Sequence, residues 1–220
     1  MELQSFAWRR GSAVPLPESP AVPGARRFDL VVMAASAGGV KAFEALLGQI
    51  PADFALPIAI VQHRSARDPN LMARVLSRHT ELPVKIAEAG ERLQPGAVYL
   101  APPDAHLMVD ADLRVALADG RKIRGVLSSA NPLFESAARA FPSRVIAVVL
   151  TGYDSDGTDG VQAVKLSGGT VIAQDEASSE SFGMPRSAIE TGCVDRVLPL
   201  QEIGPALVAL ADARAESLSE

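Results

Sequence analysis

Short apolar runs rich in valine and isoleucine alternate along this chain with segments of helical periodicity. Several of the runs are almost continuously apolar, which is typical of strands that are covered on both faces. After the first run, Val40, Phe43, Leu47 and Ile50 recur at spacings of three and four residues, which places them on one side of a helix. The runs occupy residues 28–35, 57–62, 83–87, 97–101, 144–150, 170–174 and 196–200.

This alternation of strand and helix predicts a doubly wound α/β fold, with a mostly parallel sheet and helices on both faces. Asn131 is expected to cap the helix that begins there. Segment 83–127 differs, because its short runs are separated by turn residues such as Gly96 and Pro102. It predicts an antiparallel hairpin excursion at the edge of the sheet. Further helical patterns lie at 69–80, 131–141, 160–166, 185–191 and 202–213.

Composition narrows the class of protein. Apolar residues make up 48% of the 220 residues and charged residues 21%, which is ordinary for a soluble globular domain. The formal net charge of −5 argues against a general nucleic-acid binder, because neutralising phosphates needs clustered Lys and Arg. No run approaches the roughly 18 to 20 apolar residues of a membrane span, so we expect no membrane insertion. The single cysteine, Cys193, excludes an intrachain disulfide and is compatible with a cytoplasmic location.

The chain ends differ from the rest in composition. Residues 1–27 are rich in Pro, Ala, Ser and Arg and show no periodicity, which predicts a flexible N-terminal arm. We expect one domain over residues 28–214, followed by a short tail at 215–220.

Three polar residues with complementary chemistry follow predicted strands. Ser36 follows the first run, His63 follows the second, and Asp156 lies in the loop after the run at 144–150. The carboxyl ends of parallel strands meet at one edge of a sheet, where functional residues gather. An imidazole can take the proton of a serine hydroxyl, and a carboxylate can orient that imidazole and stabilise its charged form. The pattern predicts a Ser-His-Asp triad with Ser36 as the nucleophile.

Other interpretations of these residues stay open at this point. Ser36 could simply cap a helix, and the turn at 36–39 could hold a phosphate on its N–H groups, although it lacks the lysine of a P-loop. The aspartates of loop 154–159 suggest a calcium loop, but the twelfth position is Lys165 rather than Glu. His106 follows another strand-like run and is a rival base, or a supporting or substrate-contacting residue.

Five segments together resemble the catalytic domain of the chemotaxis protein-glutamate methylesterases, the CheB family. The resemblance extends from about Phe28 to Leu200. It implies that Ser36, His63 and Asp156 form the triad, and that the backbone N–H groups of Ala37 and Tyr153 stabilise the oxyanion. The segments are VVMAASAGGVKAF, IAIVQHRS, GERLQPGAVYLAPPDAHL, AVVLTGYDSDGTDGV and GGTVIAQDEASSESFGMPRSAI.

The resemblance also implies a reaction and a partner. The reaction is hydrolysis of glutamyl methyl esters on chemoreceptors, with release of methanol and, in some members, deamidation of glutamine. No cofactor or metal is implied. The expected partner is a methylated chemoreceptor or another signalling protein. Candidate substrate contacts are Arg64, His106, Met184 and Arg186.

The chain departs from the family pattern in several places. CheB proteins usually begin with a receiver domain, whereas only about 27 residues precede the catalytic part here, so we expect a stand-alone domain that a separate response-regulator chain could control. Arg64 and Ser65 replace a common Met-Pro pair, and Leu127 and Asn131 stand where the family has Arg and Asp. Substrate recognition is therefore expected to diverge. An esterase acting on a different protein or small ester, or a non-catalytic receptor-docking module, remain alternatives.

Overall fold

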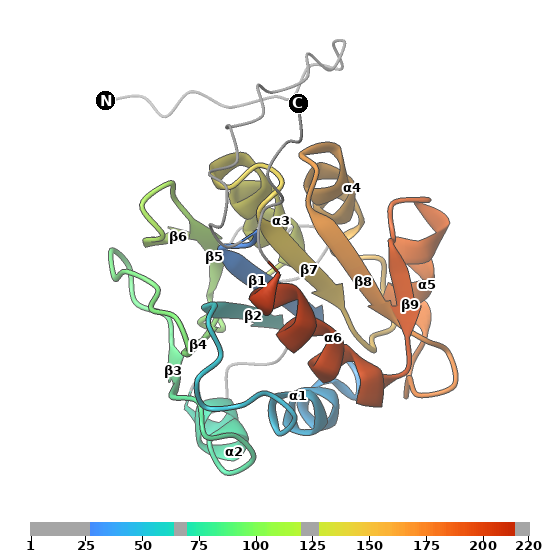
Figure 1. Cartoon of the computed structure of the whole chain (residues 1–220), viewed down its shortest axis with the longest axis horizontal. Coiled ribbons are helices and arrows are strands. Elements are labelled where there is room, and N and C mark those ends of the chain that lie inside the picture. The colour runs from blue at the N-terminus through green and yellow to red at the C-terminus, as the bar shows by residue number, and fades with distance from the viewer. Residues whose placement is uncertain (1–26, 64–69, 120–127, 214–220) are drawn as a thin grey trace.

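The computed structural model of the chain describes residues 27–63, 70–119 and 128–213 (Figure 1). Within these residues, seven strands form one sheet in which every pairing is parallel. The order across the sheet is β3-β4-β2-β1-β7-β8-β9. The strands are β1 (Leu30–Ala35), β2 (Ile58–Gln62), β3 (Val84–Ile86), β4 (Val98–Leu100), β7 (Val145–Val149), β8 (Thr170–Gln174) and β9 (Arg196–Leu198).

Helices cover both faces of this sheet, as predicted. One face packs against α1 (Gly39–Leu47), α2 (Leu71–Leu76) and α6 (Leu200–Asp212). The other packs against α3 (Ala130–Ala140), α4 (Thr158–Leu166) and α5 (Gly183–Glu190). The doubly wound α/β fold is thereby confirmed. Among the described helices, none is long and apolar enough to cross a membrane.

The central strand β1 shows why the apolar runs are continuous. Its side chains point alternately to the two faces, and both faces are covered by helices. All six residues are fully buried. Leu30, Val32 and Ala34 belong to the core beneath α3, and Val31, Met33 and Ala35 belong to the core beneath α1.

The antiparallel excursion is confirmed, but it is shorter than segment 83–127. It consists of β5 (Ala105–Val109) and β6 (Val115–Asp119), which pair antiparallel and pack against α3. The earlier part of the segment contributes β3 and β4 to the main sheet. The loop between β3 and β4 hydrogen-bonds to the β5–β6 hairpin, from Gly90 N–H to Val115 O and from Leu93 N–H to Leu113 O. Its turn residues therefore belong to a connection between two strands of the main sheet, and not to a second hairpin.

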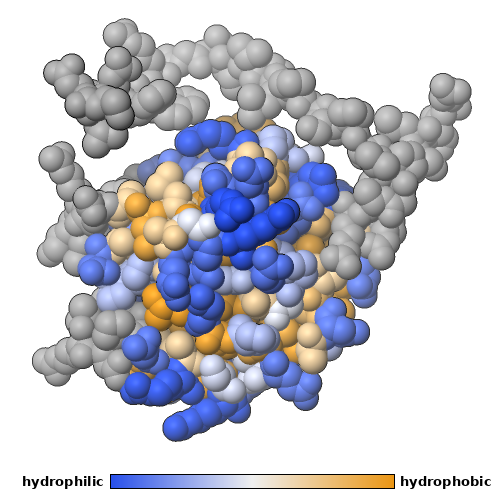
Figure 2. Space-filling view, turned by 90° about the vertical axis from the view of Figure 1, so that its left-hand side faces the viewer, coloured by the Kyte–Doolittle hydropathy of each residue, from blue (hydrophilic) through white to orange (hydrophobic). Residues whose placement is uncertain are grey.

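Edge strand β3 carries charges that limit further strand pairing. Lys85 at its centre contacts Glu91 at 2.9 Å and Glu88 at 3.1 Å. Charged side chains on an edge strand discourage pairing with another chain. On the side of the molecule with β3 and the β5–β6 hairpin, hydrophilic residues are intermixed with apolar ones (Figure 2).

The start of α3 differs from the prediction. Ser129, not Asn131, is the N-cap, and its Oγ accepts the N–H of Asn131 at 3.3 Å. Asn131 is buried, and its Oδ1 accepts the N–H of Gly160 at 2.9 Å. Asn131 therefore joins α3 to α4 instead of capping its own helix. The helix begins at Ala130, so its first N–H groups lie beside the residues that follow β7.

Candidate active site

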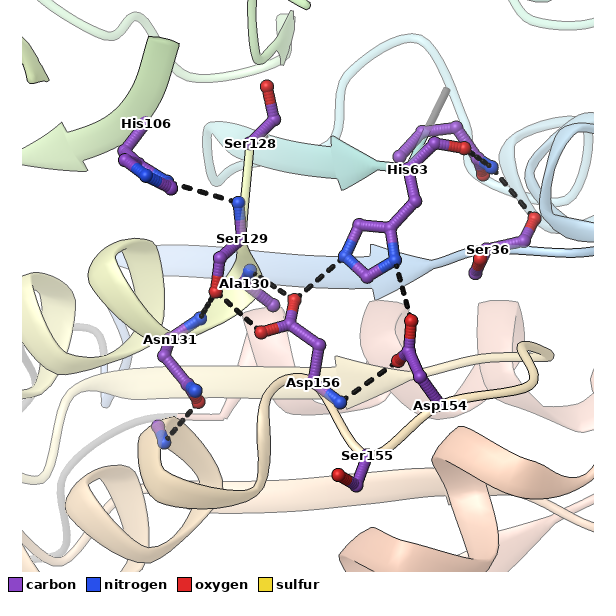
Figure 3. A network of polar contacts seen from close by, with 12 residues as sticks. Ser36, His63, His106, Ser128, Ser129, Ala130, Asn131, Asp154, Ser155 and Asp156 are labelled. Carbon is purple, nitrogen blue, oxygen red and sulfur yellow. Dashed lines mark hydrogen bonds and ion pairs between the residues drawn. The ribbon is translucent and has the colours of Figure 1, made fainter. Parts of the chain in front are cut away.

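Three neighbouring strands end at the same edge of the sheet and carry the predicted triad (Figure 3). Ser36 follows β1 at the centre, His63 follows β2 on one side, and Asp156 lies in the loop after β7 on the other side. The chain leaves β1 toward β2 and returns later to pair β7 with its opposite edge. Such a reversal opens a crevice at the carboxyl ends of the strands, where ligands commonly bind.

The structure brings His63 and Asp156 together. Nε2 of His63 lies 2.8 Å from Oδ2 of Asp156, and the exposed fractions of the two side chains are only 9% and 1%. The backbone N–H of His63 donates to Ala35 O at 3.1 Å, which fixes the backbone of His63 relative to the end of β1. A buried carboxylate on one ring nitrogen leaves the other nitrogen to exchange a proton with a nucleophile.

The side chain of Gln62 connects the backbone of Ser36 to that of His63. Nε2 of Gln62 donates to Ser36 O at 2.7 Å and to His63 O at 3.0 Å, so one buried amide holds both backbones. The N–H of Ser36 donates to Thr151 O at 2.9 Å, which joins the serine to the loop after β7. The Ser36 hydroxyl makes no hydrogen bond within the residues that the structure describes, so it is not yet engaged by the imidazole.

The two glycines after Ser36 explain the S-x-G-G turn. Gly38 has φ +77°, a left-handed conformation that residues with a Cβ rarely adopt. A Cβ on Gly39 would lie 2.1 Å from Oε1 of Gln62 and 2.6 Å from Cβ of Ala35. The close approach of helix α1 to Gln62 therefore requires a glycine at this position.

The two predicted oxyanion donors lie on loops that are tied together. Thr151 Oγ1 donates to Ala37 O at 2.9 Å, which connects the loop after β7 to the turn after β1. A Cβ on Gly152 would lie 2.9 Å from Cβ of Ser36, so this glycine packs directly against the serine. Within the described part of the chain, neither the N–H of Ala37 nor that of Tyr153 donates to another group. Both remain available to a ligand oxygen.

Asp156 is held by two groups that the sequence interpretation missed. Ser129 Oγ donates to Oδ1 at 2.5 Å, and the N–H of Ala130 donates to Oδ2 at 2.6 Å. Burial favours the neutral acid, but hydrogen bonds from His63, Ala130 and Ser129 outweigh it and hold the pKa of Asp156 below its usual range. The carboxylate therefore stays ionised. A serine two residues before the predicted helix was the available signal, because serine is a typical N-cap.

A second carboxylate faces His63. Oδ2 of Asp154 lies 3.2 Å from Nδ1, a charge contact without hydrogen-bond alignment. Oδ1 of Asp154 accepts the N–H of Asp156 at 2.9 Å. Burial lowers the pKa of His63, but Asp154 and Asp156 together overcome this and raise it from 6.5 to about 9. Contact with His63 in turn lowers the pKa of Asp154. Within the described residues, no group of three or more His, Cys, Asp or Glu could hold a metal ion.

Comparison with known proteins decides the family. The family model described as CheB methylesterase matches residues 31–207. The chain belongs to the CheB methylesterase family. The crystal structure of the Thermotoga maritima CheB methylesterase catalytic domain has a TM-score of 0.80 and 40% identity, and the match covers 83% of this chain and 98% of that one.

Curated relatives in the CheB family extend the match. The Rhizobium meliloti (strain 1021) "protein-glutamate methylesterase/protein-glutamine glutaminase of group 3 operon" is 46% identical over 87% of this chain, which spans 54% of that protein. A putative protein-glutamate methylesterase/protein-glutamine glutaminase of Leptospira interrogans (serovar copenhageni, strain Fiocruz L1-130) is 37% identical over 83% of this chain and 95% of its own length. The chain thus spans about half the length of the first relative and nearly all of the second.

Two candidate substrate contacts of this CheB-family chain lie inside the protein. His106 is buried, and its Nδ1 accepts the N–H of Ser129 at 3.1 Å. This position suits the supporting role considered for His106, because the buried ring contacts Ser129, whose hydroxyl holds Asp156. Met184 is also buried, and its N–H donates to Gly152 O at 2.8 Å. It packs beneath the loop that carries the predicted Tyr153 donor.

The remaining candidates lie at the surface or outside the described residues. Arg186 is exposed, lies over the ring of Phe182 at 5.4 Å, and contacts Glu176 at 3.4 Å. Tyr153 is 79% exposed at the rim of the site. Arg64 lies outside the described residues. Of the predicted contacts that lie in the described residues, Arg186 is therefore the charged one that is exposed to solvent.

Proposed function

We propose that this chain is a protein-glutamate methylesterase that uses Ser36, His63 and Asp156 as its catalytic triad. The observation that carries the proposal is the buried contact of 2.8 Å between His63 and Asp156, at the strand end next to Ser36. The names of the Rhizobium meliloti and Leptospira interrogans relatives support the substrate class, because both are described as protein-glutamate methylesterase/protein-glutamine glutaminase.

In the first step Ser36 attacks the carbonyl carbon of the methyl ester. Its hydroxyl proton passes to Nδ1 of His63, the ring nitrogen that Asp156 does not hold, and the carbonyl oxygen becomes an oxyanion. The N–H groups of Ala37 and Tyr153 would stabilise that oxyanion. Losing one such donor typically lowers turnover by roughly 10²- to 10³-fold.

In the second step the ester bond breaks and methanol leaves with the proton from His63. Water then attacks the acyl-enzyme while His63 again accepts a proton, which yields a glutamate side chain and restores Ser36. Deamidation of glutamine would follow the same course, with ammonia in place of methanol. Asp156 takes no proton, and its charge stabilises the imidazolium that forms in both steps.

The substrate we propose is a methylated chemoreceptor or another methylated signalling protein, in the cytoplasm. Such a segment presents glutamates around the ester, so a cation at the rim would attract it. Arg186 has the required exposure and charge. Its ion pair with Glu176 has a distance of 3.4 Å, and both side chains are exposed to water, so the pair is weak. Tyr153 offers an exposed ring at the same rim.

Methanol release from methylated receptor membranes tests the proposal directly. The native protein should release methanol, whereas Ser36→Ala should release none and keep its melting temperature, because the hydroxyl has no partner in the described structure. Ser77→Ala, at the exposed C-cap of α2, is the matched control and should keep full activity.

A fluorophosphonate probe separates the alternatives, because only an activated serine reacts with it. Labelling at Ser36 without methanol release would indicate an esterase with another substrate. Absence of both would overturn the catalytic proposal and favour a docking module.

A further inference from the structure

The ring of His63 lies between two carboxylates, and a serine triad needs only one. Nε2 is occupied by Asp156, so Nδ1 is the nitrogen left to accept the proton of Ser36. Nδ1, however, faces Asp154 (Figure 3). A nitrogen that keeps its proton for a carboxylate cannot act as a general base. The observed arrangement is therefore one in which the base is not available to the nucleophile.

We propose that Asp154 is a positioning residue that holds His63 in a protonated resting state, and that catalysis requires the contact between Asp154 and Nδ1 of His63 to open. We term the contact between Asp154 and Nδ1 of His63 the resting contact. The inference rests on the proposed function, because it concerns the same histidine in its role as base. It makes Asp154 a restraint on the esterase, in contrast to Asp156, which supports it.

The two carboxylates differ in how firmly they are held. Asp156 is 1% exposed and receives hydrogen bonds from Ser129 and Ala130, so its contact with His63 is fixed. Asp154 is 41% exposed, and its contact with Nδ1 lacks hydrogen-bond alignment. Only its Oδ1 is anchored, by the N–H of Asp156. A modest rotation of Asp154 would open the resting contact and leave the contact with Asp156 intact.

The other charged groups described around the site do not contact the ring of His63. His106 of β5 meets the network through the N–H of Ser129, not through His63. On the side of α1, Glu180 contacts Lys41 at 3.6 Å beside Gly38. Within the described residues, the charged side chains that contact His63 are those of Asp154 and Asp156. Burial lowers the pKa of the His63 ring, and among the described residues Asp154 and Asp156 are the ones that raise it.

Opening the contact changes the proton balance at Nδ1. With both carboxylates in place the pKa of His63 is about 9, so the ring is an imidazolium near neutral pH. When Asp154 moves away, the pKa of His63 falls and a larger fraction of the rings releases the Nδ1 proton to solvent, which leaves the nitrogen with a free lone pair for Ser36. A substrate that displaces Asp154 would thus activate the base as it binds.

Asp154→Asn isolates the charge, because the amide oxygen can still accept the N–H of Asp156. Asp154→Ser, which also keeps an acceptor, serves if the first variant folds poorly. Asp53→Asn is the control, since Asp53 is exposed in the segment before β2, away from the carboxyl ends of the strands. NMR titration can follow each ring, because the chain has three histidines and each can be assigned by substitution. The pKa of His63 should fall by about 1 in Asp154→Asn and stay unchanged in Asp53→Asn.

The rate of fluorophosphonate labelling at Ser36, measured against pH, tests the catalytic consequence. The native protein should gain reactivity only as the pH approaches the high pKa of His63. In Asp154→Asn this rise should move to lower pH, and labelling near pH 7 should become roughly ten-fold faster if the pKa of His63 falls as expected. Asp53→Asn should follow the native curve.

The outcomes separate the two proposals. If the native protein and Asp154→Asn are labelled with the same dependence on pH, the proposed role of Asp154 is overturned, but the proposed esterase function is not. Slower labelling of Asp154→Asn at every pH would also overturn it, because it would make Asp154 a supporting residue. Absence of labelling in all of the proteins would overturn the proposed function itself.

Discussion

Nε2 of His63 lies 2.8 Å from Oδ2 of Asp156, although 93 positions separate the two residues in the sequence. The parallel sheet produces this contact, because β2 and β7 flank β1 and end at the same edge. The start of α3 then completes it from a fourth element, through Ser129 and Ala130. Asp156 is consequently better fixed than Ser36, the proposed nucleophile, whose hydroxyl makes no hydrogen bond within the described residues.

Ser129→Ala should weaken both the helix and the site. The variant loses the cap of α3 and the hydrogen bond to Asp156, so we expect unfolding to become easier by about 1–2 kcal/mol. Turnover should fall roughly ten-fold, because an acid with one fewer hydrogen bond orients His63 less well. Ser129→Thr keeps the hydroxyl and should restore most of both losses, whereas equal kcat in Ser129→Ala and the native protein would contradict a positioning role.

Stability should depend on pH through His63. Its pKa is raised from 6.5 to about 9 in the folded protein, so its contribution is fully present below pH 6.5 and is lost as the pH rises through 9. The size of the loss should be about 2–3 kcal/mol. Asp154 and Asp156 have lowered pKa values, so their contributions are present above their ordinary pKa and are lost in acid.

Urea unfolding at several pH values between 6.5 and 9.5 measures this dependence. His63→Gln should remove most of the decline in the free energy of unfolding across that window. His79→Gln changes an exposed histidine that follows α2 and lies near Glu44 of α1, and this variant should keep the decline. An identical slope in His63→Gln and the native protein would show that another group is responsible.

The apolar runs were sufficient to predict the strands, the parallel sheet and the edge where Ser36, His63 and Asp156 lie. Strands covered on both faces leave a strong local signal, and their carboxyl ends follow from their direction. Asp154 and Ser129 were missed because their roles depend on contacts across the sheet. Nothing local distinguishes Asp154 from the other aspartates of its loop.

The predicted length of the antiparallel excursion and the predicted role of Asn131 were wrong for the same physical reason. The loop between β3 and β4 contains turn residues because it crosses to the β5–β6 hairpin, and the pairing partner of a short strand is not encoded locally. Asn131 has the chemistry of a cap, but α4 packs against α3 and supplies Gly160 as a different partner. In both cases a tertiary contact outweighed a local preference.

Gly39→Ala should damage the site through the backbone. The added methyl group would lie 2.1 Å from Oε1 of Gln62, the amide that holds the backbones of Ser36 and His63. Overpacking of this kind typically costs about 1–3 kcal/mol of stability. We expect a lower melting temperature together with loss of fluorophosphonate labelling, and a variant that keeps both values would show that Gln62 can move away freely.

Arg186→Glu should affect binding more than chemistry. Arg186 is exposed in α5, two residues after the buried Met184, and its charge reversal would repel a segment rich in glutamate without removing a triad residue. We expect KM for methylated receptor to rise while kcat stays within about two-fold of the native value, which is the signature of lost uniform binding. Arg196→Glu, on the exposed edge strand β9, is the matched control and should leave KM unchanged. A fall in kcat at constant KM would instead assign Arg186 to the transition state, and equal effects of the two reversals would leave only the net charge of the domain as the cause.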